Sequence, residues 1–164
     1  MERRIIQRPD KIAFAGIPDE EGKVTTYNRM RGFKNLSTSK NPKEYTRQYV
    51  DMSQEITDVV GMSESKDFEL DQYVNDPVHE YIAAIFDEER LGDAATIHIM
   101  TVDTTVASGS DNAILREYKV IPDTAGDGVE AYVYTGRFVA ATPVQKVKAT
   151  IAEDGLTATK TDGV

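Results

Sequence analysis

The chain has 164 residues, of which 40% are hydrophobic and 29% charged, the size and composition of one folded domain with a single core. It contains no cysteine, which excludes disulfide bonds, thiolate catalysis and cysteine-based zinc sites. Its net charge of −9 argues against a general nucleic-acid binder, because such affinity comes mainly from lysine and arginine neutralising phosphates.

The chain begins with a basic segment, residues 1–11, which carries four arginines and lysines and has little periodicity. We expect it to form an N-terminal arm. Its charged start is not followed by an apolar run, so it does not resemble a signal peptide, and no later run approaches the roughly 18 apolar residues of a membrane helix.

Short strands are predicted at residues 12–15 and 24–30, separated by a turn rich in glycine, proline and acidic residues. Residues 32–43 are rich in serine, threonine, asparagine and lysine, and we expect a long polar loop or extended hairpin there. In residues 44–52 β-forming side chains recur, and alternation puts Tyr45, Arg47 and Tyr49 on one face.

Residues 67–73 open with strict alternation of acidic and apolar side chains. In a strand, Phe68 and Leu70 would point to one face and Asp67, Glu69 and Asp71 to the other. Three carboxylates would then share one surface of the sheet.

One helix is predicted, over residues 76–91. Asp76 is suited to the N-cap, Pro77 to the first helical position, and Gly92 to the position just past the end. The apolar side chains recur at helical spacing, which predicts that the helix lies flat on a sheet; they are Val78, Tyr81, Ile82, Ile85 and Phe86.

Beyond Gly92 the pattern returns to strands, at residues 96–102, 114–121, 130–139, 144–151 and 156–161. Short strands with a single helix indicate a β-sandwich or barrel. Residues 131–134 and 138–139 are apolar on both faces, which suits a strand covered by its own core and by a neighbouring copy. Tyr132, Tyr134 and Phe138 are therefore candidate subunit-interface residues.

No catalytic or cofactor motif is found. His79 and His98 lack ligand spacing and are assigned structural or surface roles, and phosphate-cradling glycine motifs and a G-x-S-x-G elbow are absent. Residues 123–128 imitate the start of a calcium loop, but Ala125 and Tyr134 occupy ligand positions. We predict a protein that is not an enzyme and has no cofactor or metal.

The order of several phrases along the chain resembles the major tail tube protein of long, non-contractile-tailed (siphovirus-type) bacteriophages. The resemblance runs over residues 41–103 and 118–159, well over half the chain. The phrases are RQYVD (47–51), TDVVG (57–61), NDPVHEYIAAIFDEERLG (75–92), YKVIPDTAGDG (118–128), YTGRFVA (134–140) and KVKATIAEDGLTAT (146–159).

The resemblance implies a single tail-tube domain over residues 1–164, mainly β with two packed antiparallel sheets flanked by one helix. It implies rings of six copies that stack into a tube through which DNA is ejected. The protein would be assembled in the host cytoplasm and located in the virion tail. Its partners would be other copies, a tape-measure protein, tail tip or terminator proteins and, transiently, DNA, with no membrane.

The resemblance also implies roles for two surfaces. The loop 32–43 would reach the next ring, with Lys34, Lys40 and Lys43 facing acidic groups there. The face of Asp67, Glu69 and Asp71 would line the bore, because an acidic wall repels phosphates. The alternative is that these carboxylates face outer solvent.

Three other interpretations of the whole chain stay open. The first is an inner tube of a contractile tail or of a type VI-like secretion system. The second is a carbohydrate-binding β-sandwich module, which the aromatic content allows. The third is a small hydrolase with paired carboxylates, which requires two acids to converge in a deep pocket.

Overall fold

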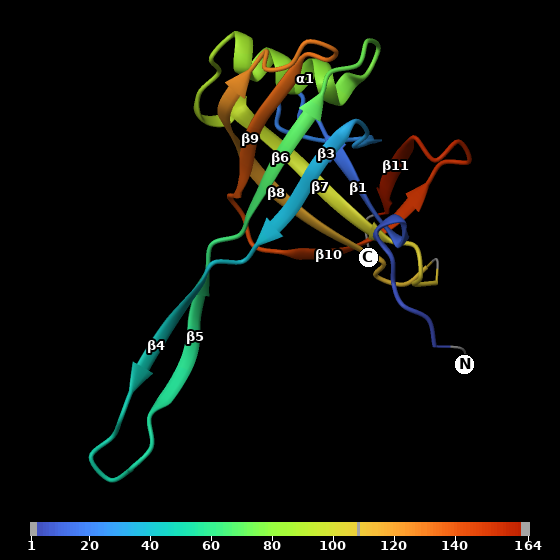
Figure 1. Cartoon of the computed structure of the whole chain (residues 1–164). Helices are drawn as coiled ribbons and strands as arrows, with labels where there is room; N and C mark the ends of the chain where they lie inside the picture. The colour runs from blue at the N-terminus through green and yellow to red at the C-terminus, as the bar shows by residue number, and fades with distance from the viewer. Residues whose placement is uncertain (1–2, 108, 162–164) are drawn as a thin grey trace.

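A computed structural model describes residues 3–107 and 109–161 (Figure 1). Residues 1–2 of the expected arm and the last three residues of the expected domain lie outside this range. The elements in chain order are η1 (Arg8–Asp10), β1 (Lys11–Gly16), β2 (Tyr27–Arg29), β3 (Phe33–Ser39), β4 (Pro42–Arg47), β5 (Ile56–Met62), β6 (Ser65–Asp71), α1 (Pro77–Asp87), η2 (Gly92–Ala95), β7 (Thr96–Asp103), β8 (Ala113–Ala125), β9 (Val133–Ala140), β10 (Gln145–Ile151) and β11 (Thr157–Thr161).

Nine strands form one antiparallel sheet in the order β10-β11-β2-β1-β7-β8-β9-β6-β3, and β4 pairs with β5 in a separate two-stranded sheet. The expected fold class, mainly β with one flanking helix and antiparallel sheets, is confirmed in the described residues.

Six of the nine strands of the large sheet close into a barrel, because β10 pairs with the start of β8 as well as with β11. Each of the six strands in this ring contributes to a core inside it. The buried residues of this barrel core are Phe14, Tyr27, Met100, Val102, Ala113, Leu115, Ala149 and Ala158. Closure leaves these strands without free edges, which limits uncontrolled pairing with other chains.

A second core lies on the other side of β1, β7 and β8. In Figure 1, β3 and β6 lie in front of β7 and β8, and α1 lies across the end of the two layers. The cluster between them includes Ile97 and Ile99 of β7, Phe68 and Leu70 of β6, and Ile82 of α1. Strand β7 is buried on both faces because it separates the two cores, which explains its nearly continuous apolar sequence.

The helix begins as the sequence predicts. The Asp76 carboxylate accepts hydrogen bonds from the backbone N–H groups of Val78 and His79, with Pro77 at the first helical position. The helix ends at Asp87, earlier than the predicted residue 91. Glu89 has a left-handed φ of 50°, which α-helical geometry does not allow, so the chain leaves the helix before Gly92.

Of the two forms expected for residues 32–43, the polar loop is wrong and the extended hairpin is nearer, because β3 pairs with β6 and β4 pairs with β5. Residues 33–39 are strand β3, paired with β6, and the projecting hairpin starts only at Pro42. Phe33 and Leu36 pack against the core between the layers, which holds this polar sequence to the sheet. The polar loop was a wrong expectation because β3 is an outermost strand, whose solvent-facing residues have the composition of a loop.

Candidate assembly surfaces

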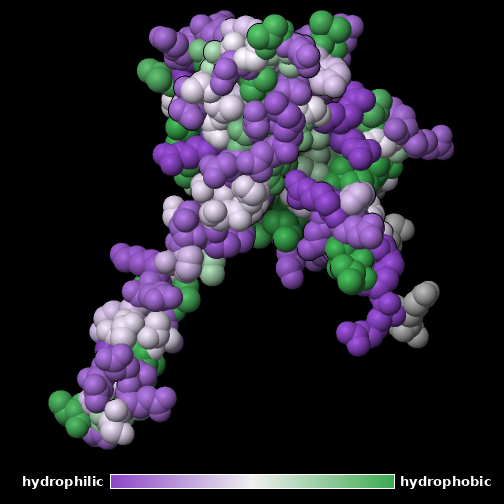
Figure 2. Space-filling view, in the orientation of Figure 1, coloured by the Kyte–Doolittle hydropathy of each residue, from purple (hydrophilic) through white to green (hydrophobic). Residues whose placement is uncertain are grey.

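The hairpin of β4 and β5 projects from the body of the protein as an arm (Figures 1 and 2). Its strands pair only with each other among the described elements. An isolated two-stranded hairpin is marginally stable in water. The arm nevertheless exposes large apolar side chains, which marks a surface for a partner; they are Tyr45, Tyr49, Val50, Met52, Val59, Val60 and Met62.

One face of the arm is ordered around Arg47. Its guanidinium lies over the rings of Tyr45 and Tyr49, with 5.1 and 5.8 Å to the ring centroids, and contacts Asp58 at 2.6 Å. Hydrogen bonds to Tyr49 and Asp58 raise the pKa of Arg47. The prediction that Tyr45, Arg47 and Tyr49 share a face is confirmed, and the stacking stiffens a hairpin that has no core of its own.

A buried carboxylate anchors the root of the arm. Glu64, only 4% exposed, lies between β5 and β6. It accepts hydrogen bonds from Arg116 Nη1 at 2.6 Å, Tyr118 Oη at 3.0 Å and Lys40 Nζ at 3.2 Å, while Lys66 Nζ lies 3.8 Å away. Because Lys40 precedes β4 and Arg116 lies on β8, this cluster ties both ends of the hairpin to the body.

The cluster favours an ionised Glu64. Burial alone would raise the pKa of this carboxyl, but hydrogen bonds from Tyr118 and Lys40 and the positive charges of Lys66 and Lys40 outweigh burial and lower the pKa. Burial lowers the pKa of Lys66 and, together with Glu64, raises that of Tyr118.

The acidic residues of β6 lie as the alternation predicts. Phe68 and Leu70 are buried, whereas Asp67, Glu69 and Asp71 occupy the opposite, more exposed face. The nearest cation is within the same chain, because Lys34 Nζ lies 3.2 Å from both Glu69 Oε1 and Asp71 Oδ1. This face is therefore acidic but partly neutralised.

The three lysines predicted for the contact between rings lie in different surroundings. Lys34 is on β3 and pairs with β6, and Lys40 pairs with buried Glu64. Lys43 lies on β4 and is exposed, with no ion pair to the described residues. Only Lys43 is on the projecting hairpin.

Two of the three aromatic residues proposed for a subunit interface need a correction. Phe138 is 0% and Tyr134 2% exposed, because both pack in the core between the layers. Burial, followed by the charge of Asp87, raises the pKa of Tyr134 to about 12. The apolar sequence of β9 reflects this intrachain packing, and only Tyr132, at 52% exposed, is open to a partner.

The sheet has a free edge at β3, the last strand in the order. A groove of about 660 Å³ runs beside it, between β3 and the strands β1 and β2. Its apolar lining includes Ile12, Met30, Phe33 and Leu36, and no carboxylate is among its described lining residues. Its cationic lining residues are Arg8, Lys11, Arg29 and Lys34, of which Lys34 also pairs with Glu69 and Asp71 of β6, and we name it the basic groove.

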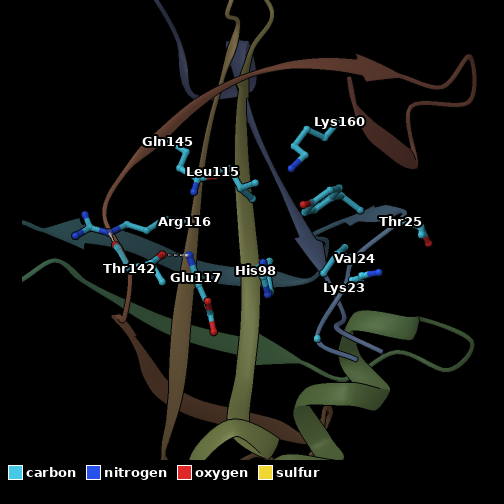
Figure 3. Close-up of a pocket in the computed structure, with 12 residues that line it drawn as sticks. Lys23, Val24, Thr25, His98, Leu115, Arg116, Glu117, Thr142, Gln145 and Lys160 are labelled. Carbon is cyan, nitrogen blue, oxygen red and sulfur yellow. Dashed lines mark hydrogen bonds between the residues drawn. The ribbon is translucent and has the colours of Figure 1, made fainter. Parts of the chain in front are cut away.

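A second cavity, of about 520 Å³, opens at one mouth of the barrel (Figure 3). His98 faces it, and burial lowers the pKa of this imidazole, opposed by the charge of Glu117. Glu117 is the single carboxylate among the described lining residues, so the cavity lacks the pair that a carboxylate hydrolase uses.

His79 is fully buried and connects the first turn of α1 to the backbone at Tyr73 and Arg31. Its Nδ1 accepts a hydrogen bond from the Tyr73 backbone N–H at 2.9 Å, and its Nε2 donates to the Arg31 carbonyl at 2.5 Å. Gly32, at φ 76°, lies so close that an added Cβ would be 2.8 Å from His79 Cε1. These contacts make His79 a structural residue, as predicted.

Within residues 3–107 and 109–161, no group of three or more histidine, aspartate or glutamate side chains is placed to hold a metal ion. In the same part of the chain, no helix has the length and apolar character needed to span a membrane.

No protein-family model matches the sequence, and neither does any curated protein. Solved structures do share the fold. A chain from the tail of an empty GTA particle with C6 symmetry matches at a TM-score of 0.56 and 9% identity, over 87% of this chain and 98% of that one. A chain from the six-fold symmetrised baseplate of the anti-feeding prophage (AFP) matches at 0.51 and 9%, over 90% and 98%. The chain therefore has the fold of components of tail particles.

Proposed function

We propose that this chain is a structural subunit of a phage or phage-like tail, which joins copies of itself in rings that stack into a tube. The observation that carries the proposal is the hairpin arm on a shared tail-component fold. The arm exposes apolar side chains to solvent, has no core, and is held rigidly at its root by Glu64. Such an arm is explained if a second copy covers it.

The finer form of the proposal follows the sequence resemblance. The rings have six copies, the tail is of the siphovirus type, and the tube conducts DNA. The six-fold symmetry of the two assemblies that share the fold supports the ring size. The resemblance implies a ring-to-ring contact at residues 32–43, and in this proposal the arm, residues 42–62, makes that contact instead.

In this proposal the face of Asp67, Glu69 and Asp71 lines the bore. It is the face of β6 turned away from the core, and its carboxylates would repel DNA phosphates within a Debye length of about 8 Å at physiological salt. Lys34 reduces this charge without removing it.

A second candidate is the inner tube of a contractile tail or secretion system, and the likeness to a baseplate chain supports it. Negative-stain microscopy of the purified protein tests both. Long hollow filaments support a tube subunit, whereas isolated rings that do not stack support a position at the end of a tail. A stable monomer at high concentration would overturn both, and glycan binding by that monomer would indicate a carbohydrate-binding module.

A further inference from the structure

The basic groove has the properties of a docking site for a strand. The edge of β3 that borders it pairs with no other strand of the described chain, so its backbone groups are open to a partner. One carbonyl on β3, that of Leu36, already accepts a hydrogen bond from Arg8 Nη2 at 3.2 Å. The lining combines apolar and cationic side chains. The groove therefore suits an extended segment with apolar and acidic side chains.

The far end of the arm is such a segment. Residues 48–55 carry Asp51 and Glu55 and no lysine or arginine. Val50 and Met52 flank Asp51 on either side and are exposed. The adjoining strands β4 and β5 pair only with each other in the described chain, so each has a free edge that can extend a sheet. The tip thus matches the groove in charge, in apolar surface and in backbone pairing.

The two surfaces lie on different parts of one molecule. In Figure 1 the arm points away from the sheet that contains β3 and β1, so the tip does not reach the groove of its own chain. The sequence is unevenly charged, because residues 1–47 hold eleven lysines and arginines against six acidic residues, whereas residues 48–91 hold two against twelve. All four cations of the groove come from the basic segment 1–47, and the acidic tip comes from the segment 48–91.

We propose that the basic groove of one copy receives the acidic tip of the arm of the next copy. This inference rests on the proposed self-assembly and names the two surfaces that join. Because donor and acceptor surfaces differ, the contact is heterologous, and each copy can accept one arm and donate another. The opposite charges steer encounter and set the orientation, and the apolar side chains of the tip are covered on binding.

Charge reversal tests the pairing. The tip variant carries Asp51→Lys and Glu55→Lys, and the groove variant carries Arg8→Glu and Arg29→Glu. All four positions lie outside the buried cores, so each variant is expected to keep the wild-type circular dichroism spectrum. In sedimentation experiments, neither the tip variant nor the groove variant alone should form the large assemblies that the wild type forms. An equimolar mixture should recover them, because the acidic tip of the groove variant then meets an unchanged basic groove, and the basic tip of the tip variant meets the two new glutamates at positions 8 and 29.

A matched control tests whether a different acidic segment of the neighbouring copy occupies the basic groove. Asp127 and Glu130, in the turn between β8 and β9, are exposed acids that could also face the groove in a neighbouring copy. The variant with Asp127→Lys and Glu130→Lys should assemble as the wild type does. Loss of assembly in this variant, with recovery on mixing with the groove variant, would overturn the assignment to the arm.

The remaining outcomes are also decisive. If the tip variant assembles normally, or if the folded tip and groove variants do not co-assemble, the docking inference is wrong while the tail function stands. If the wild type stays monomeric, the proposed function and this inference both fail.

Discussion

Arg116 on β8 donates a hydrogen bond of 2.6 Å to Glu64, the buried residue that connects the arm to β6. The same guanidinium donates through Nε to the Thr142 carbonyl at 2.7 Å, which fixes its position. Glu64 also accepts the Ala140 backbone N–H through its own carbonyl at 2.9 Å. The direction of the arm is thus set by contacts with β8, β9 and the connection that follows β9.

We expect Glu64→Gln to destabilise the fold by about 2 to 4 kcal/mol, because it leaves partly buried cations without their counter-charge. Urea unfolding followed by circular dichroism measures the change. Glu69→Gln is the control, since its pair with Lys34 is solvent-exposed and should contribute less than about 1 kcal/mol. Equal effects of the two substitutions would contradict the central role of Glu64.

The contribution of Glu64 should depend on pH in the acid range. Its pKa in the folded protein lies below the ordinary value of 4.5, so the unfolded chain binds this proton more readily. The stabilisation is fully present above the ordinary value and is lost as pH falls through the lowered pKa. The difference in unfolding free energy between wild type and Glu64→Gln should be constant above about pH 5 and shrink below it. A difference that grows in acid would contradict this assignment.

The local elements could be predicted from sequence because their determinants are close together in the chain. The cap at Asp76 and Pro77 and the alternation through Phe68 and Leu70 each occupy a few residues. Strand β3 could not be recognised, because its partner β6 is distant in the sequence and its exposed residues resemble a loop. Strand β5, Ile56–Met62, was not predicted, since it gains its structure from pairing with β4 and not from a buried face.

Removal of the His79 side chain should destabilise the protein strongly. His79→Ala leaves the Arg31 carbonyl and the Tyr73 N–H without this partner and opens a cavity beside Gly32, at a cost of about 3 kcal/mol or more. His98→Ala, at a partly exposed position in the barrel mouth, should cost less. Thermal unfolding measures the stability of both variants. An equal loss of stability in the two would mean that the two hydrogen bonds of His79 contribute little to the stability of the fold.

The exposed apolar residues of the arm should matter for assembly and not for folding. Val59→Ser with Val60→Ser removes apolar surface that only a partner would cover, so monomer stability should change by less than about 0.5 kcal/mol per site. Assemblies measured by light scattering should be lost. Leu91→Ser, at an exposed position outside the arm, is the control and should assemble normally.

The candidate surfaces were harder to predict than the fold, because burial depends on packing between distant elements. Tyr134 and Phe138 have the aromatic character of interface residues, yet α1 and β6 cover them in the same chain. Glu64 contacts Arg116 and Tyr118, which are more than 50 positions away in the sequence, and no local sequence motif predicts this cluster. The alternation of acidic residues in β6 could be predicted from the sequence. The position of Lys34, whose charge partly neutralises this acidic face, could not.

The acidic face of β6 gives the most direct test of a DNA conduit. Reversal of Asp67, Glu69 and Asp71 to Lys would place new cations beside Lys34, so the variant should also carry Lys34→Glu, which keeps an ion pair with residues 69 and 71. If this face lines the bore, the phosphates should bind the basic wall and DNA ejection from assembled particles should slow. The control reverses three exposed carboxylates elsewhere, Glu20, Glu89 and Glu153. Ejection at the wild-type rate from intact tubes of the β6 variant would show that these carboxylates face the outside.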